Sequence, residues 1–408
     1  MNMISKFITN NLYAFSLYTR QIAGTIVLFV IAHYLSVYDY GLFTSYKSII
    51  TFCFMLANME YANYILVSSK VNIHEVKLKI ALFLLNAIMI AFCIMFFSLF
   101  FKLDNHLLFI LIVIRTFFDG VFFALILPFF QAAKKFNTIA IINIIYSVCI
   151  SIIAIISYIL KLSLIKFLLL NICLGFINFV QCSYYAKINY VLAINNIKRF
   201  VKMLDKSIFG YIGSTVSNYL YAETSSLYVA TFLPKEQAAL YFSAGTIAMI
   251  VGLLSAAQTQ KMLPELIKSD TKKTIEIIKK NLITVGGLLL IVLLFLLIFG
   301  KLVLKLLYGQ DYYVNAYPIL IMYFIANIFI ANGAIFGVYL TAINQQYIKI
   351  KMKVETTIIT ILGLIILHKY AIYGAVIALL ISSIYVSARF TFVSLRFIRQ
   401  GEVNERQF

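Results

Sequence analysis

The sequence predicts an all-α integral membrane protein with about twelve transmembrane helices, arranged as two six-helix bundles around a central cavity. Three observations lead to this fold class. The chain is 63% hydrophobic and only 12% charged, whereas a soluble domain has about 25% charged residues. Its apolar residues form long continuous runs, and a weak internal repeat appears near half the chain length.

The apolar runs set the predicted helices in order. Each run is close to or above the roughly 20 residues that cross a bilayer core as a helix. Within the bilayer the backbone must satisfy its own hydrogen bonds, which a helix does. The predicted spans are 12–34, 41–67, 78–101, 106–132, 137–160, 163–185, 207–232, 237–262, 281–300, 316–342, 350–368 and 370–397.

Lysine and arginine residues predict the orientation of these spans. An even number of spans puts both termini on one side of the membrane. That side carries 23 of the 34 Lys and Arg residues, against 7 on the other side and 4 within spans. By the positive-inside rule, both termini are expected in the cytoplasm.

The composition also excludes several classes of function. A net charge of +19 in a soluble protein would suggest nucleic acid, but here it is explained by topology signals beside anionic lipid. The five cysteines and four histidines show no metal-ligand spacing, so no metal site, cofactor or nucleic-acid partner is predicted. The N-terminus lacks the features of a cleaved signal peptide, and no processing is expected.

The internal repeat divides the chain. At an offset of 198 residues, AHYLSVYDYGLFTSYKSI (32–49) aligns with ATFLPKEQAALYFSAGTI (230–247), which places span one over span seven. Parallel six-plus-six repeats are a transporter architecture, with the substrate path between the halves. We therefore expect bundles at 1–200 and 201–408. The basic connections 187–207 and 263–281 are either surface helices or solvated linkers.

Charges in the first hairpin are the first candidate site. A charge at the centre of a membrane helix costs roughly 2.5–3.5 kcal/mol, so Arg20, Lys47 and Glu60 should face a protein interior or a wet cavity. Arg20 shares a face with Ser16 and other small or polar residues. It binds either cargo or a neighbouring acid such as Glu60. Lys47 is near a helix end and can instead reach water, and Glu60 is either a cavity acid or a helix-end residue.

The fourth and seventh spans carry the other candidates. Arg115 and Asp119 are four residues apart and are expected to form a local ion pair. In the seventh span a hydroxyl-rich stripe suits sugars, although helix packing through Ser and Tyr is the commoner role. This stripe comprises Tyr211, Ser214, Asn218, Tyr221 and Ser225, with Glu223 on a neighbouring face.

Four local patterns resemble the Wzx-type O-antigen flippases, the polysaccharide-transport branch of the multidrug/oligosaccharidyl-lipid/polysaccharide (MOP) exporter superfamily. The resemblance extends over the whole chain. Two departures from the family pattern are the loss of a glycine at Ala62 and Ala239 where glycine is usual. The patterns are AHYLSVYDYGLF, LANMEYANYIL, YLYAETSSLYVATFLPKEQAALYFSA and LLYGQDYYVNAYPILIMY.

The resemblance implies a flippase that moves undecaprenyl-diphosphate-linked oligosaccharide across the inner membrane for lipopolysaccharide biosynthesis. A diphosphate in a low-dielectric cavity needs cations, and the two-pronged guanidinium suits it. Substrate binding is therefore expected of the cations Arg20, Lys47 and Arg115 and of the polar residues Tyr211, Asn218 and Tyr221. Coupling to H⁺ or Na⁺ is expected of the acids Glu60, Asp119 and Glu223.

Two other classes of function remain open. A membrane polysaccharide polymerase or glycosyltransferase would need a sizeable outer loop or an acid pair there, and the outer connections are short. A multidrug exporter of the same superfamily is the second alternative, and a path lined by cations favours an anionic cargo instead. The polymerase and chain-length machinery of polysaccharide assembly are further expected partners, besides membrane lipid.

Overall fold

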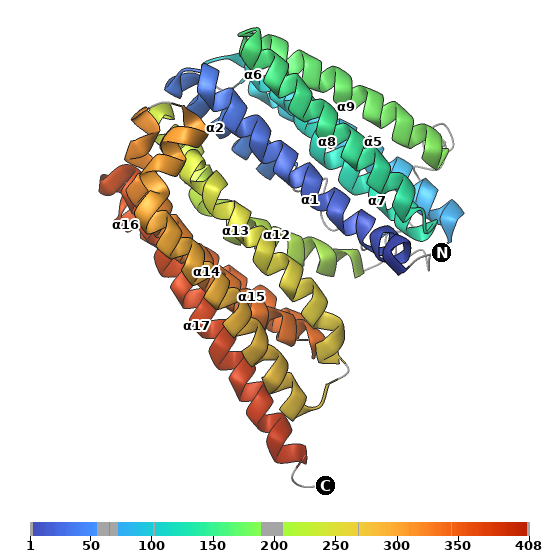
Figure 1. Cartoon of the computed structure of the whole chain (residues 1–408), viewed down its shortest axis with the longest axis vertical. Coiled ribbons are helices and arrows are strands. Elements are labelled where there is room, and N and C mark those ends of the chain that lie inside the picture. The colour runs from blue at the N-terminus through green and yellow to red at the C-terminus, as the bar shows by residue number, and fades with distance from the viewer. Residues whose placement is uncertain are drawn as a thin grey trace. The chain divides into compact units, whose positions relative to one another are not determined.

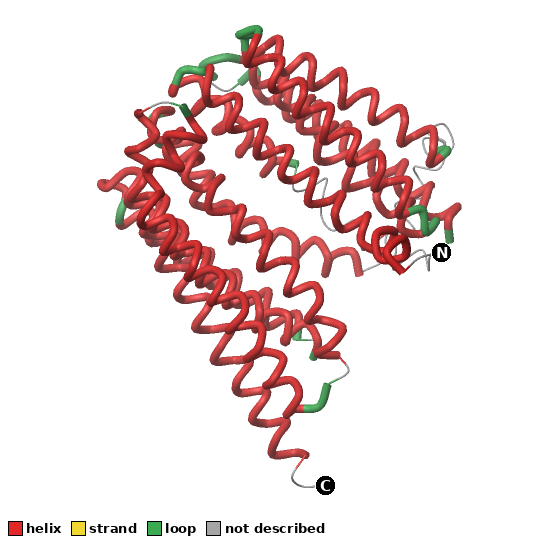
Figure 2. Tube along the Cα trace, in the orientation of Figure 1, coloured by secondary structure: helices red, strands yellow, loops and turns green. Residues whose placement is uncertain are grey.

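The computed structural model describes residues 3–54, 65, 72–100, 103–188, 207–267, 269–309, 311–343 and 345–405. Within these ranges the chain consists of helices joined by short turns and loops, and none of the described residues forms a strand (Figure 2). The all-α prediction is therefore confirmed. The candidate Glu60 and the connection 189–206 lie outside the described residues.

Each predicted span overlaps a helix in the described part of the chain (Figure 1). In the N-terminal part, the fourth predicted span is a compound helix of α6, a π-helical turn η1 and α7. The helices of this part are α1 (Met3–Tyr34), α2 (Val37–Cys53), α5 (Ile73–Ser98), α6 (His106–Thr116), η1 (Phe117–Val121), α7 (Phe122–Ala132), α8 (Phe136–Ile159) and α9 (Leu164–Ala186).

The C-terminal part continues the same pattern. Its short 3₁₀ turns are η2 (Asp311–Ala316) and η3 (His368–Tyr370). Its helices are α12 (Ser207–Phe232), α13 (Lys235–Ile267), α14 (Thr271–Tyr308), α15 (Tyr317–Ala342), α16 (Gln346–Ile366) and α17 (Ala371–Glu405). Seven helices of the described ranges are long and apolar enough to cross a membrane by length and composition alone.

Polar residues fix where the helices begin. The side chain of Ser36 accepts a hydrogen bond from the backbone of Asp39 at the start of α2, and Asn105 does the same for Leu108 at the start of α6. These caps satisfy backbone N–H groups that have no partner within the helix. At the other end of α14, Gly309 adopts φ 68°, a left-handed conformation that glycine accommodates without strain and that ends the helix.

Of the two alternatives for the connection 263–281, a helix or a solvated linker, the structure favours the helix. α13 runs to Ile267 and α14 begins at Thr271, so most of that basic segment is helical. Asp270 caps α14, accepting at 2.8 Å from the backbone N–H of Lys273. The lysines marked the end of the apolar run correctly. They did not mark the end of the helix, because a helix that extends into water keeps its backbone hydrogen bonds.

The repeat offset is reproduced at the first hairpin of each half. α1 ends at Tyr34 and α12 ends at Phe232, which are 198 residues apart. α2 begins at Val37 and α13 at Lys235, again 198 residues apart. The sequence alignment at this hairpin is therefore confirmed.

The chain separates into two compact units, Met1–Val216 and Ser217–Phe408. In the first, α1 packs along α8, and α6 lies against both α2 and α9. In the second, α15 packs against α13, α14 and α17. Gly333 of α15 allows this approach, because a Cβ there would lie 3.3 Å from the Cα of Ser387 in α17.

Candidate functional site

A pocket of about 260 Å³ lies within the first unit. The three cations named from the sequence share it, although they come from three different predicted spans. Its wall is built from α1, α2, α6, η1 and α8. The lining residues are Arg20, Gly24, Lys47, Thr51, Phe54, Ile112, Arg115, Thr116, Asp119, Gly120, Tyr146 and Ile150.

Arg20 reaches the pocket from the inward face of α1. Ser16, Ala23 and Val27 are buried along that face, and Arg20 follows Ser16 by one helical turn. Its Nη1 donates to Asn143 Oδ1 at 3.1 Å, and its Nη2 donates to the backbone carbonyl of Asp119 at 2.5 Å. The helix periodicity that packs α1 against α8 thus also carries Arg20 into the interior of the unit.

The guanidinium of Arg20 also lies over an aromatic ring. Its Cζ is 4.7 Å from the centre of the Tyr146 ring on α8. Such a cation–π contact contributes on the order of 0.5–2 kcal/mol, more where water is excluded. Together with the two hydrogen bonds it defines one orientation for the Arg20 side chain.

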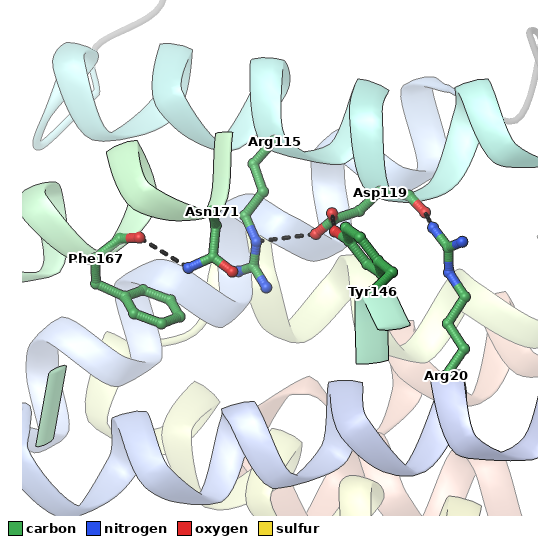
Figure 3. A network of polar contacts seen from close by, with 6 residues as sticks. All are labelled: Arg20, Arg115, Asp119, Tyr146, Phe167 and Asn171. Carbon is green, nitrogen blue, oxygen red and sulfur yellow. Dashed lines mark hydrogen bonds and ion pairs between the residues drawn. The ribbon is translucent and has the colours of Figure 1, made fainter. Parts of the chain in front are cut away.

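Arg115 is buried on α6, with 8% of its surface exposed. Its Nε donates to Asp119 Oδ2 at 3.1 Å, which is the ion pair expected from their four-residue spacing (Figure 3). Its Cζ lies 5.7 Å from the ring centres of both Phe43 and Phe167. The charge is therefore held by one carboxylate and two aromatic rings.

Asp119 lies on the π-helical turn η1 and joins several of these groups (Figure 3). Its carboxylate accepts from Arg115 and from the hydroxyl of Tyr146, while its backbone carbonyl accepts from Arg20. A π turn adds one residue to a helical turn and is frequent at functional sites. On the far side of the turn, Gly175 of α9 approaches so closely that a Cβ there would lie 2.7 Å from Phe118 Cβ.

The described lining of the pocket is cationic. Three cationic side chains stand against one carboxylate, and apolar helices surround them. Gly24 and Gly120 leave room, since a Cβ on either would meet no atom within 4 Å. A site with this balance attracts an anion, and the surrounding apolar helices strengthen the attraction because they lower the local dielectric constant.

The remaining site residues named from the sequence lie elsewhere in the chain. Tyr211, Asn218, Tyr221 and Glu223 are all on α12, and none of them lines this pocket. Asn218 accepts a hydrogen bond from Lys353 of α16. The sequence thus named two separate groups of residues, and the pocket contains the cations together with Asp119.

The second unit has a polar cluster that the sequence analysis did not name. Glu355 of α16 accepts from Tyr385 at 2.9 Å and from Arg389 Nη2 at 3.3 Å, both on α17. This cluster links two helices that pack along each other. The ion pair with Glu355 explains how the charge of Arg389 is accommodated within the second unit.

Asn143 and Tyr146 are the residues of the first site that the sequence analysis missed. Both are on α8 and hold Arg20 or Asp119. Their three-residue spacing put them on one face of a largely apolar span, and this was the available signal. Neutral polar residues in membrane helices are usually packing contacts, so the signal was weak.

No protein-family model matches the chain, and no curated protein matches it either. Solved structures do. An inward-facing multidrug resistance MATE family transporter of the MOP superfamily aligns at TM-score 0.61 and 12% identity, over 96% of this chain and 95% of the other. A MOP superfamily transporter from Pyrococcus furiosus aligns at TM-score 0.61 and 13% identity, over 96% and 94%.

These similarities show the fold. The protein is an all-α, multi-pass membrane protein with the twelve-helix fold of the MOP-superfamily transporters. It is also similar in fold to the lipid II flippase MurJ in an inward closed conformation, at TM-score 0.75 and 16% identity, over 96% of this chain and 90% of the other. At identities this low, structural similarity establishes the fold alone. The cargo must therefore be argued from the pocket.

Proposed function

We propose that the protein is a flippase that moves undecaprenyl-diphosphate-linked O-antigen, or a related polysaccharide repeat unit, from the cytoplasmic to the periplasmic leaflet. One observation carries the proposal. Arg20, Lys47 and Arg115 line a single pocket inside an apolar helical unit. Intramembrane charges are costly, and a shared cationic pocket gives them a common role in binding an anion. The similarity in fold to a lipid II flippase supports the same proposal.

The size of the pocket limits what it holds. A volume of about 260 Å³ is below the roughly 300–1,000 Å³ typical of sites for drug-sized molecules. We therefore assign it the diphosphate alone. Arginine pairs with phosphate oxygens through two parallel hydrogen bonds, which gives both affinity and orientation.

The rest of the cargo would lie outside this pocket. We propose that the α12 residues Tyr211, Asn218 and Tyr221 contact sugar, since hydroxyl, amide and ring groups suit it. The lipid tail would stay in the bilayer while alternating access carries the headgroup across. Within the same proposal, export is coupled to H⁺ or Na⁺ through Glu223 and Glu60. Asp119 is the weakest of the three coupling candidates, because it already pairs with Arg115.

The main alternative is a multidrug exporter, since MATE transporters share the fold. A pocket lined by three cations and one carboxylate attracts anions and repels cationic compounds. The pocket therefore favours the anionic cargo. We further propose a bacterial inner-membrane location with both termini cytoplasmic, from the distribution of Lys and Arg.

Export by arginine variants tests the proposal. Arg20→Ala and Arg20→Lys are expressed in a flippase-deficient strain, and surface polysaccharide is measured per unit of membrane-inserted protein. Alanine should abolish export, and lysine should restore part of it because it keeps the charge but loses the fork. Arg389→Lys is the matched control, an intramembrane arginine that is paired within the second unit.

Normalising to protein abundance separates binding from folding. Arg20 ties α1 to α8 and to η1, and losing hydrogen bonds of a charged group costs about 1.5–3 kcal/mol each. Some loss of abundance is therefore expected with Arg20→Ala. Normal export per molecule by this variant would remove Arg20 from the mechanism and with it the proposed diphosphate site.

A further inference from the structure

Asp119 contacts both arginines of the pocket through two different groups. Its carboxylate accepts from Arg115 Nε at 3.1 Å, and its backbone carbonyl accepts from Arg20 Nη2 at 2.5 Å. We propose that Asp119 is a positioning residue that holds the two guanidiniums as one clamp, and that this clamp makes the pocket select a diphosphate over a monophosphate. The inference rests on the proposed function, since it takes a lipid-linked diphosphate as cargo.

The contact with Arg115 orients the guanidinium without occupying its whole donor edge. Only Nε is engaged by the carboxylate, and among the described residues Nη1 and Nη2 have no acceptor. Those two nitrogens form the end of the fork that pairs with two phosphate oxygens. Asp119 therefore holds the side chain through Nε, and both Nη atoms of this pocket-lining residue keep their donors for a ligand.

Packing holds Asp119 itself in place. On the α9 side of the π turn, Gly175 lies so close to Phe118 that even a methyl group would clash at 2.7 Å. On the pocket side, the hydroxyl of Tyr146 donates to the carboxylate. With the backbone and the side chain both held, the carbonyl and carboxylate keep a fixed separation, and so do the arginines that they hold. Supporting contacts of this kind preorganise a binding site.

Selectivity follows from this fixed arrangement. A monophosphate is held well by a single guanidinium fork, so it gains little from the relative position of two. A diphosphate has two phosphoryl groups joined at a fixed distance, and it gains from both arginines only when they are correctly spaced. Releasing Arg115 from Asp119 should therefore weaken diphosphate binding far more than monophosphate binding.

Calorimetric titration of the full-length protein in lipid nanodiscs tests this inference, with inorganic pyrophosphate and inorganic phosphate as the probes at constant ionic strength. The variants are Asp119→Ala and Asp119→Asn. The asparagine side-chain oxygen can still accept from Arg115, so it should preserve part of the arrangement. Glu355→Ala is the matched control, because Glu355 likewise accepts from an arginine and a tyrosine but lies in the second unit.

The wild-type protein should prefer pyrophosphate. Asp119→Ala should lower pyrophosphate affinity by roughly 10- to 100-fold, the loss expected from a misplacement near 1 Å, with a much smaller change for phosphate. Asp119→Asn should fall between, and Glu355→Ala should keep the wild-type ratio. A merely structural role would lower both affinities together.

The opposite results are equally clear. Removing a carboxylate from a cationic pocket strengthens anion binding if Asp119 only neutralises charge. Unchanged or tighter pyrophosphate binding by Asp119→Ala, or by Asp119→Asn if the alanine variant does not fold, would overturn the inference and leave the proposed function standing. A wild-type protein that binds neither probe would contradict the proposed cargo, and the inference would fall with it.

Discussion

Gly175 offers a test of the site from outside the pocket. In Gly175→Ala the new Cβ would lie 2.7 Å from Phe118 Cβ and 3.5 Å from its Cγ, whereas ordinary contacts begin at 3.4 Å. The first atom of a side chain cannot swing away, so α9 and η1 must separate by roughly 0.7 Å or deform. Overpacking of this kind costs about 1–3 kcal/mol. Asp119 is the next residue after Phe118, so the displacement should reach both arginines.

We expect Gly175→Ala to lower the unfolding temperature modestly and to weaken pyrophosphate binding by roughly tenfold or more, because small displacements of positioned groups have large effects. Thermal unfolding and calorimetry in nanodiscs measure the two effects separately. Gly363→Ala is the matched control, since its Cβ would lie 3.0 Å from Ala378 Cβ in the second unit. It should lower stability and leave binding unchanged. Wild-type binding by Gly175→Ala, or equal loss of binding by both variants, would refute the reasoning.

Three further predictions use the same assays or simple reporters. Gly24→Leu should fill the pocket and abolish pyrophosphate binding although all charges remain present. The control Gly287→Leu also enters open space, but it lies on an exposed face of α14 and should bind pyrophosphate normally. Equal binding by both variants would show that the pocket is not the site. Tyr146→Phe keeps the ring over Arg20 but loses the hydrogen bond to Asp119, so pyrophosphate affinity should fall by about 2- to 12-fold, the equivalent of 0.5–1.5 kcal/mol; an unchanged affinity would remove that bond from the site. Reporter fusions at Lys135 should report cytoplasm and those at Lys369 periplasm, and the reverse pattern would overturn the orientation.

Much of the fold was readable from the sequence, because each helix must bury about 20 apolar residues in lipid. The same physics identified Arg20, Lys47 and Arg115, since a charged side chain in a membrane span costs free energy and usually has a ligand or a partner. The Arg115–Asp119 pair followed from helix geometry. The sequence could not show that these cations share one pocket, because that depends on how α1, α2 and α6 pack.

The parts that escaped prediction have specific physical causes. The π turn at FFDGV adds one residue to a helical turn, and nothing in its sequence distinguishes a π turn from an α-helical one. Asn143 is neutral, so placing it inside the membrane costs little free energy and does not mark it as functional. It is also 123 residues from its partner Arg20, so the sequence does not indicate their contact. The sequence left the connection 263–281 open between a helix and a solvated linker, since charge marks the membrane boundary and a helix can continue beyond it.

The aromatic rings beside Arg115 affect how its charge responds to dissolved salt. With Phe43 and Phe167 near the guanidinium and 8% of the residue exposed, counterions have little access to that charge. At 0.15 M ionic strength the screening length in water is about 8 Å, but this applies to charges that ions can surround. The attraction at Arg115 should therefore persist from dilute buffer to concentrated cytoplasm, while the exposed lysines outside the spans are largely screened.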